Sequence, residues 1–63
     1  MTAEEMFKKM GGEMEVIDKN NFYWFLVDGY IHFDDGVVST NIDELSDDEK
    51  SAMNQQMKEL GWL

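Results

Sequence analysis

Two sequence signals mark where helices begin, and together they leave only the middle of the chain for strands. Thr2 and Glu5 stand three residues apart, as do Ser46 and Glu49, which is the spacing of a capping box. In such a box the hydroxyl accepts a hydrogen bond from the glutamate N–H, and the carboxylate accepts one in return. We therefore expect one helix near each end of the chain.

The residues after each box predict how far each helix runs. The first helix is expected over about residues 3–10, because an apolar stripe at helical spacing ends at Gly11-Gly12; the stripe is Ala3, Met6, Phe7 and Met10. The second is expected over about residues 47–60, with an apolar stripe of Met53, Met57 and Leu60 and with Ala52 beside it. Gly61 stands where a Schellman cap would fold Trp62 back toward Met57.

The segment between the helices, within residues 13–41, has the composition of strands. Phe22 to Val27 is an unbroken aromatic and aliphatic run, which is typical of a sheet. Asp28-Gly29 and Asp35-Gly36 are favoured two-residue hairpin loops, so we expect four strands, or three if one pair forms a bulge. The predicted pairs are Val27 with Tyr30, Leu26 with Ile31, Trp24 with Phe33, and Phe33 with Val38.

This register divides the sheet into two faces. Both helical stripes can cover the face that carries Trp24, Leu26, Ile31, Phe33 and Val38. The other face is too apolar for open water; it is expected to be covered by a dimer partner, bound to a target or partly shielded by the twist of the sheet. It carries Tyr23, Phe25, Val27, Tyr30, His32 and Val37. The predicted fold is thus a single α+β domain, residues 1–63, in which a short N-terminal helix, a three- to four-stranded antiparallel meander and a C-terminal helix follow one another, with both helices on one face.

Charge and length exclude several classes of protein. A chain of 63 residues with no Cys buries only about 60% of its unfolded surface, so burial alone must stabilise one small domain. A net charge of −9 repels nucleic-acid phosphates and anionic membranes, so neither is an expected partner. No apolar run approaches the roughly 18 residues of a membrane span, and the N-terminus lacks signal-peptide character, so we expect an intracellular protein.

The reactive side chains do not form a recognisable catalytic pattern. The only imidazole, His32, lies between two apolar residues of a predicted strand, where Ser39 across the hairpin favours a surface hydrogen bond over a nucleophile. Asp28, Asp34 and Asp35 do not have the spacing of a calcium loop, and a domain this small has little room for a cleft between paired carboxylates. We therefore expect no enzymatic activity, no metal site and no cofactor.

The stretch from Asp28 to Glu49 holds eight carboxylates and no Lys or Arg. Turn chemistry and helix capping explain six of them, which leaves Asp43 and Glu44 without a local reason. As one continuous negative field, the eight predict a surface for a basic partner, whereas the competing interpretation is a merely solvated face. The residues of the predicted surface are Asp28, Asp34, Asp35, Asp43, Glu44, Asp47, Asp48 and Glu49.

Both ends of the chain resemble a known group of proteins. TAEEMFKKMG at the start and SDDEKSAMNQQMKELGWL at the end are similar to small proteins encoded by phages and prophages of Gram-positive bacteria, which often begin T-A-E-E-M-F-x-K-L-G and end E-L-G-W. This chain departs from that pattern at Met10 and Gly12. The resemblance implies the same architecture, the cytoplasm of a bacterial host, and a role in modulating host machinery.

Two functions are consistent with these features. The first is a non-enzymatic binding protein that docks on a host or phage protein with a basic surface, in the manner of a DNA mimic that inhibits a nucleic-acid-binding or defence protein. The alternative is a self-associating structural or accessory protein. In that case a homodimer would bury the apolar sheet face around Tyr23, Phe25, Tyr30 and Val37.

Overall fold

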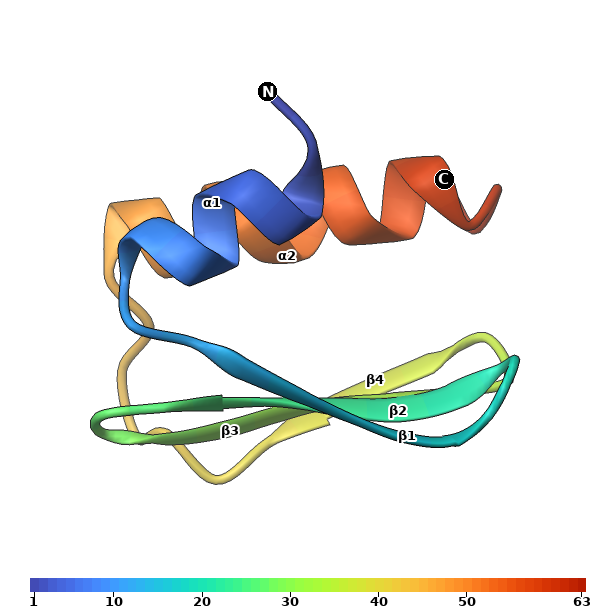
Figure 1. Cartoon of the computed structure of the whole chain (residues 1–63), viewed down its shortest axis with the longest axis horizontal. Coiled ribbons are helices and arrows are strands. Elements are labelled where there is room, and N and C mark those ends of the chain that lie inside the picture. Colours follow the sequence, from blue (N-terminus) through green and yellow to red (C-terminus); the bar gives the residue numbers. More distant parts are fainter.

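Two helices lie side by side over one face of a four-stranded antiparallel sheet (Figure 1). A computed structural model describes all residues from 1 to 63. The strands follow one another as a meander in the order β1-β2-β3-β4. The elements are α1 (Ala3–Lys9), β1 (Glu13–Asp18), β2 (Asn21–Leu26), β3 (Gly29–Asp34), β4 (Val37–Thr40) and α2 (Asp47–Glu59). The predicted α+β fold is confirmed, with four strands rather than three.

Both capping boxes form as predicted. In α1 the Glu5 N–H donates to Thr2 Oγ1 at 3.2 Å, and the Thr2 N–H donates to Glu5 Oε1 at 2.8 Å. That bond from the Thr2 backbone is the main reason why the pKa of Glu5 lies below its usual value. The same pair of bonds joins Ser46 and Glu49 at the start of α2, at 3.1 and 2.8 Å.

Glycine ends both helices. Gly11 and Gly61 each have a φ of 77°, a backbone conformation that residues with a Cβ rarely adopt. After α2 the Trp62 N–H donates to the Met57 carbonyl at 2.8 Å, which is the predicted Schellman bond. This bond turns Trp62 back over the core, where its ring centroid lies 6.3 Å from that of Phe33.

The hairpin between β3 and β4 has the predicted loop and register. Asp35 and Gly36 have φ angles of 46° and 91°, so both central residues are in the left-handed region that a type I′ turn requires. Phe33 pairs with Val38, as expected. Aspartate followed by glycine is one of the few residue pairs that tolerate this geometry. The two residues alone were therefore sufficient to predict the turn.

The predicted register of the hairpin between β2 and β3 is wrong by two residues. The loop is Val27-Asp28 instead of Asp28-Gly29, so Leu26 pairs with Gly29 and Trp24 pairs with Ile31. A shift of two residues keeps every strand side chain on its predicted face. Only Val27 leaves the sheet, and its side chain is 95% exposed in the turn.

Contacts with the segment after β4 explain why Gly29 belongs to β3. The Tyr30 N–H donates to Asn41 Oδ1 at 2.7 Å, which places the Asn41 side chain against the start of the strand. A Cβ on Gly29 would collide with Asn41 and would lie 2.8 Å from Ile42 Cγ1. Glycine at this position therefore serves close packing with a distant segment rather than the turn itself.

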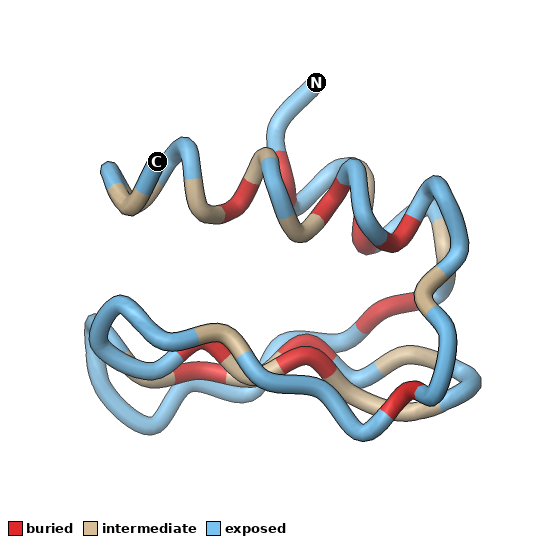
Figure 2. Tube along the Cα trace, turned by 180° about the vertical axis from the view of Figure 1, so that it is seen from behind, coloured by how far each residue is buried: buried red, intermediate tan, exposed pale blue.

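The core lies between the sheet and the helices, where the buried residues are coloured red in Figure 2. Phe7 of α1 stacks on Trp24 of β2 with ring centroids 4.7 Å apart, and Phe22 stacks on Phe33 at 5.1 Å. Ala52 of α2 is fully buried where the two helices contact each other. The buried apolar residues are Ala3, Phe7, Phe22, Trp24, Ile31, Phe33, Ile42 and Ala52.

A buried hydrogen bond joins α2 to the sheet. Gln56 is buried, and its Oε1 accepts a bond from the indole Nε1–H of Trp24 at 3.0 Å. The predicted apolar stripe of α2 packs beside this position but is only partly buried; it comprises Met53, Met57 and Leu60. The face of α2 that is most buried therefore includes the polar side chain of Gln56. Its hydrogen bond with Trp24 makes this burial tolerable.

A second polar contact joins the two helices. Glu59 Oε2 accepts a hydrogen bond from the Ala3 N–H at 2.8 Å, and the same oxygen accepts one from Gln55 Nε2 at 2.9 Å. The N–H groups in the first turn of a helix have no partner within that helix. A carboxylate of α2 thus satisfies one of them in α1 and holds the helices together.

Replacing Gln56 with leucine should destabilise the protein although the side-chain volume changes little. The Trp24 indole N–H would remain buried without an acceptor, which costs about 1–3 kcal/mol. Urea unfolding of Gln56→Leu should show this loss, whereas Asn54→Leu, at an exposed position of the same helix, should stay within about 0.5 kcal/mol of the unmodified protein. Equal stability of the two variants would contradict a structural role for the bond.

Candidate functional site

Aromatic side chains cover the sheet face that points away from the helices. We call this surface the open face; it comprises Tyr23, Phe25, Tyr30, His32 and Val37. Figure 1 shows no helix or strand beneath it, and only the segment after β4 passes below one end of the sheet. The Tyr23 ring stacks on His32 with centroids 3.9 Å apart and on Phe25 at 5.4 Å. The Tyr30 ring packs edge-on against Tyr23 and Phe25, with ring centroids 5.4 and 6.2 Å apart. These four rings form one contiguous cluster.

The rings of the open face shield one another, and no helix lies over them. Phe25 is 40% exposed, and Tyr23 and Tyr30 are half-buried. Val37 lies beside the cluster on β4, paired with Asp34, and is also exposed. The residues of the predicted apolar interface thus share one face, and three of them are in direct ring contact.

Carboxylates border the open face. Glu13 of β1 lies directly opposite Phe25, and Glu15 lies opposite Tyr23, so both acidic side chains point to the open side. Asp34 borders the same face through its pairing with Asn21. No strand contains a Lys or Arg. Glu13 and Glu15 were not among the predicted site residues, although their alternation with apolar residues in the sequence is the signal that assigns them to this face.

The eight acids of the predicted acidic surface are not all contiguous in the structure. Asp28 lies at one end of β3, whereas Asp34 and Asp35 lie at the other, a separation of about 17 Å for the strand between them. That distance is close to the shortest dimension of the molecule, which measures 23 × 22 × 18 Å. The acidic residues therefore divide between opposite ends of the sheet.

One end carries most of the exposed acids. Asp28 lies in the β2–β3 turn, and the segment that follows β4 passes this turn before it enters α2, as Figure 1 shows. The exposed acids of this segment and of the first turn of α2 are Asp43, Glu44, Asp47 and Asp48. Glu49 does not belong to this surface, because it is buried and its carboxylate accepts the Ser46 N–H.

His32 is hydrogen-bonded within the sheet. Its Nε2 lies 2.7 Å from Asn21 Oδ1, and its ring stacks on Tyr23. Ser39 is its cross-strand neighbour, as the register predicted, but the hydrogen bond is made to Asn21 instead. The imidazole thus helps to order the aromatic cluster.

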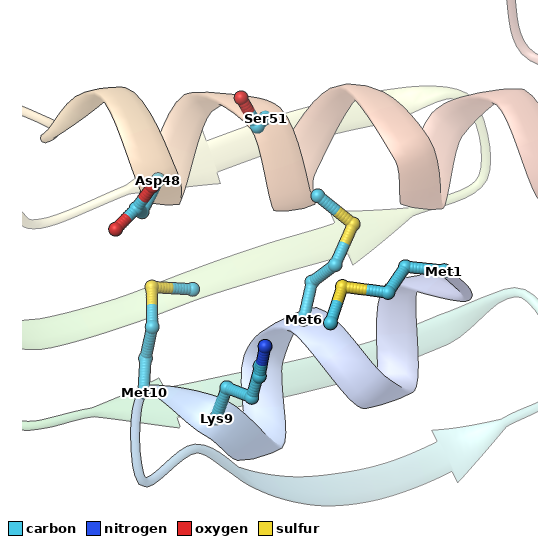
Figure 3. A pocket seen from close by; sticks show the side chains of 6 residues that line it. All are labelled: Met1, Met6, Lys9, Met10, Asp48 and Ser51. Atoms are coloured by element: carbon cyan, nitrogen blue, oxygen red, sulfur yellow. The ribbon is translucent and has the colours of Figure 1, made fainter.

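The surface depressions lie on the helical layer, away from the open face. A depression of about 190 Å³ lies between the helices, where Figure 3 shows Met6 of α1 and Met10 at its C-terminal cap pointing toward α2. Its other lining residues are Met1, Lys9, Asp48 and Ser51. No three His, Cys, Asp or Glu side chains are grouped so that they could hold a metal ion. Neither helix has the length and apolar character needed to cross a membrane.

Comparison with known proteins finds no match for this chain. No family model, no curated protein and no solved structure matches it. What the protein binds is therefore inferred from the chemistry of its own surface. The open face with its acidic border offers aromatic stacking, apolar contact and negative charge.

The open face should contribute little to stability. Replacing exposed Phe25 with alanine should lower the free energy of unfolding by about 1 kcal/mol or less, the scale of a cross-strand pair. Replacing fully buried Phe33 with alanine should cost about 3–5 kcal/mol. Thermal and urea unfolding of both variants would measure the difference. If Phe25→Ala were as damaging as Phe33→Ala, the open face would be part of the core.

Proposed function

We propose that the protein is a small, non-enzymatic binding protein of phage type that docks on a host or phage protein through the open face of its sheet. The observation that carries this proposal is the cluster of partly exposed rings, with Phe25 40% exposed, that the helices leave uncovered. An apolar patch with a polar rim is typical of an interaction site, and aromatic residues are enriched in the centres of interfaces. Phe25 and Tyr30 are the residues expected to contact the partner most closely.

The charge of the face favours a basic partner. Glu13 and Glu15 lie beside the rings, and the net charge of −9 would draw a positively charged surface toward the protein and speed the encounter. Arginine suits such a site because its guanidinium can stack on an aromatic ring while it pairs with a carboxylate. A protein that binds nucleic acid, including one that acts in host defence, has such a basic surface, and occupation of that surface would inhibit it.

The placement of the acids changes how mimicry of DNA would work. A linear array of charge from Asp28 to Glu49 would imitate a phosphate backbone, but strand geometry separates Asp28 from Asp34 and Asp35. The acidic ends can still supply long-range attraction. Contact itself is better assigned to the open face, with Glu13 and Glu15 as its charged border.

Substitution of Phe25 tests whether the partner binds the open face rather than another exposed apolar residue. Tagged protein should capture a basic or nucleic-acid-binding partner from lysate of a Gram-positive host, and Phe25→Ala should reduce capture at least about tenfold, as for a central interface residue. Val27→Ala is the matched control, because Val27 is the more exposed side chain but lies in a turn. Raised salt should weaken capture of the unmodified protein.

Three results would contradict the proposed docking. The captured proteins could lack basic surfaces, capture could be indifferent to salt, or Val27→Ala could weaken capture as much as Phe25→Ala does. Any of these would show that the open face and its acidic border do not select the partner.

Self-association through the same face is the second candidate, because the exposed rings could be covered by another copy. The border opposes it, since a second copy brings Glu13 and Glu15 of its own and another net charge of −9. Light scattering over a range of concentrations should therefore show a monomer. A dimer that Phe25→Ala converts to a monomer would instead assign the open face to the homodimer.

A further inference from the structure

We propose that β1 is a docking edge that accepts an extended segment of the partner in which basic and apolar residues alternate. This inference rests on the proposed function and adds the conformation and chemistry of the bound segment. β1 is an edge strand of six residues, and all six are exposed. Alternate residues of an edge strand leave their N–H and C=O groups unpaired, so another strand can pair with them.

The two sides of β1 differ in chemistry. Glu13 and Glu15 point to the open side, whereas Met14 and Val16 point to the helical side, because they pair with the core residues Trp24 and Phe22. Met14 and Val16 are nevertheless 45% and 60% exposed. The helices do not cover this strand, so apolar surface at the edge of the core remains in contact with water.

An added strand would complement both sides at once. Its side chains would alternate between the two faces of the sheet, with cross-strand neighbours about 5 Å from those of β1. Residues beside Glu13 and Glu15 would favour Lys or Arg. Residues beside Met14 and Val16 would favour branched apolar side chains that extend the core. The segment that fits is therefore an extended one with basic and apolar residues in alternation.

The same features disfavour a second copy of β1 and the use of the other edge. An antiparallel pair of β1 strands with their open faces aligned would place Glu13 and Glu15 near the same residues of the other copy, and such like charges are destabilising. The irregularity between Val16 and Asp18 bends the strand end and shortens the length available for pairing. That irregularity limits regular pairing for any strand added to β1, so the expected segment is short. The other edge strand, β4, has only four residues and no charged side chain.

Two short peptides of identical composition can test the edge. One alternates lysine and valine, and the other has all valines before all lysines, so that only the first presents the charges on one side of a strand. Fluorescence anisotropy should show tighter binding of the alternating peptide. Glu15→Lys should weaken that binding by about tenfold, whereas Glu44→Lys, an equal charge change at an exposed loop residue, should weaken it much less.

Amide hydrogen exchange shows where the alternating peptide binds. Added protection should appear in β1, at Glu13 to Val16, and not in α1 or α2. Equal affinity for the two peptides, equal effects of the two lysine variants, or protection outside β1 would overturn the proposed edge. If the edge fails while Phe25→Ala still abolishes partner capture, docking through the open face survives without strand addition.

Discussion

The indole of Trp24 is the point where the sheet meets both helices. Phe7 of α1 stacks on one face of its ring, and Gln56 of α2 accepts its N–H at 3.0 Å. A buried N–H without a partner is costly, so the bond sets the rotation of α2 about its axis as well as its distance from the sheet. Because both helices contact the same tryptophan, both must lie on the same face.

The two helices of this arrangement are nearly all that a chain of this length can place over the sheet. The helices have 7 and 13 residues and lie over the central strands, where Phe22, Trp24, Ile31 and Phe33 are buried. No helix covers β1 or the opposite face of the sheet. A 63-residue domain builds one two-layer core. The apolar groups that remain outside this core are the ones that we propose contact a partner. Stability and the proposed function therefore use opposite faces of one sheet.

Features determined by neighbouring residues could be predicted from the sequence, whereas features that join distant segments could not. The capping boxes, the glycine ends and the Asp35-Gly36 turn all depend on residues a few positions apart. The register of β2 against β3 depends on how Gly29 packs against Asn41, and the sequence pattern shows only the competing Asp28-Gly29 signal. From the sequence, the polar side chain of Gln56 is expected at the surface. It is buried because Trp24, 32 positions away, supplies its hydrogen-bond partner.

The candidate site, too, could be predicted only where it depends on residues close in the sequence. Strand alternation assigned Tyr23, Phe25 and Tyr30 to one face, because a register error of two residues leaves the faces unchanged. Counting charges along the chain suggested a continuous acidic surface, but a strand carries Asp28 and Asp34 to opposite ends of the molecule. The acids that border the open face are instead Glu13 and Glu15, which matter only once β1 is paired beside β2.

The most direct test of docking by the sheet is an NMR titration of the protein with its purified partner, observed at methionine methyl and aromatic signals. Met14 is the only methionine in the sheet, whereas Met6, Met10 and Met53 belong to the helical layer. Docking through the open face and the β1 edge predicts large shifts for Met14, Phe25 and Tyr30 and small shifts for the helical methionines. Shifts concentrated on the helical methionines, with Phe25 and Tyr30 unchanged, would contradict it.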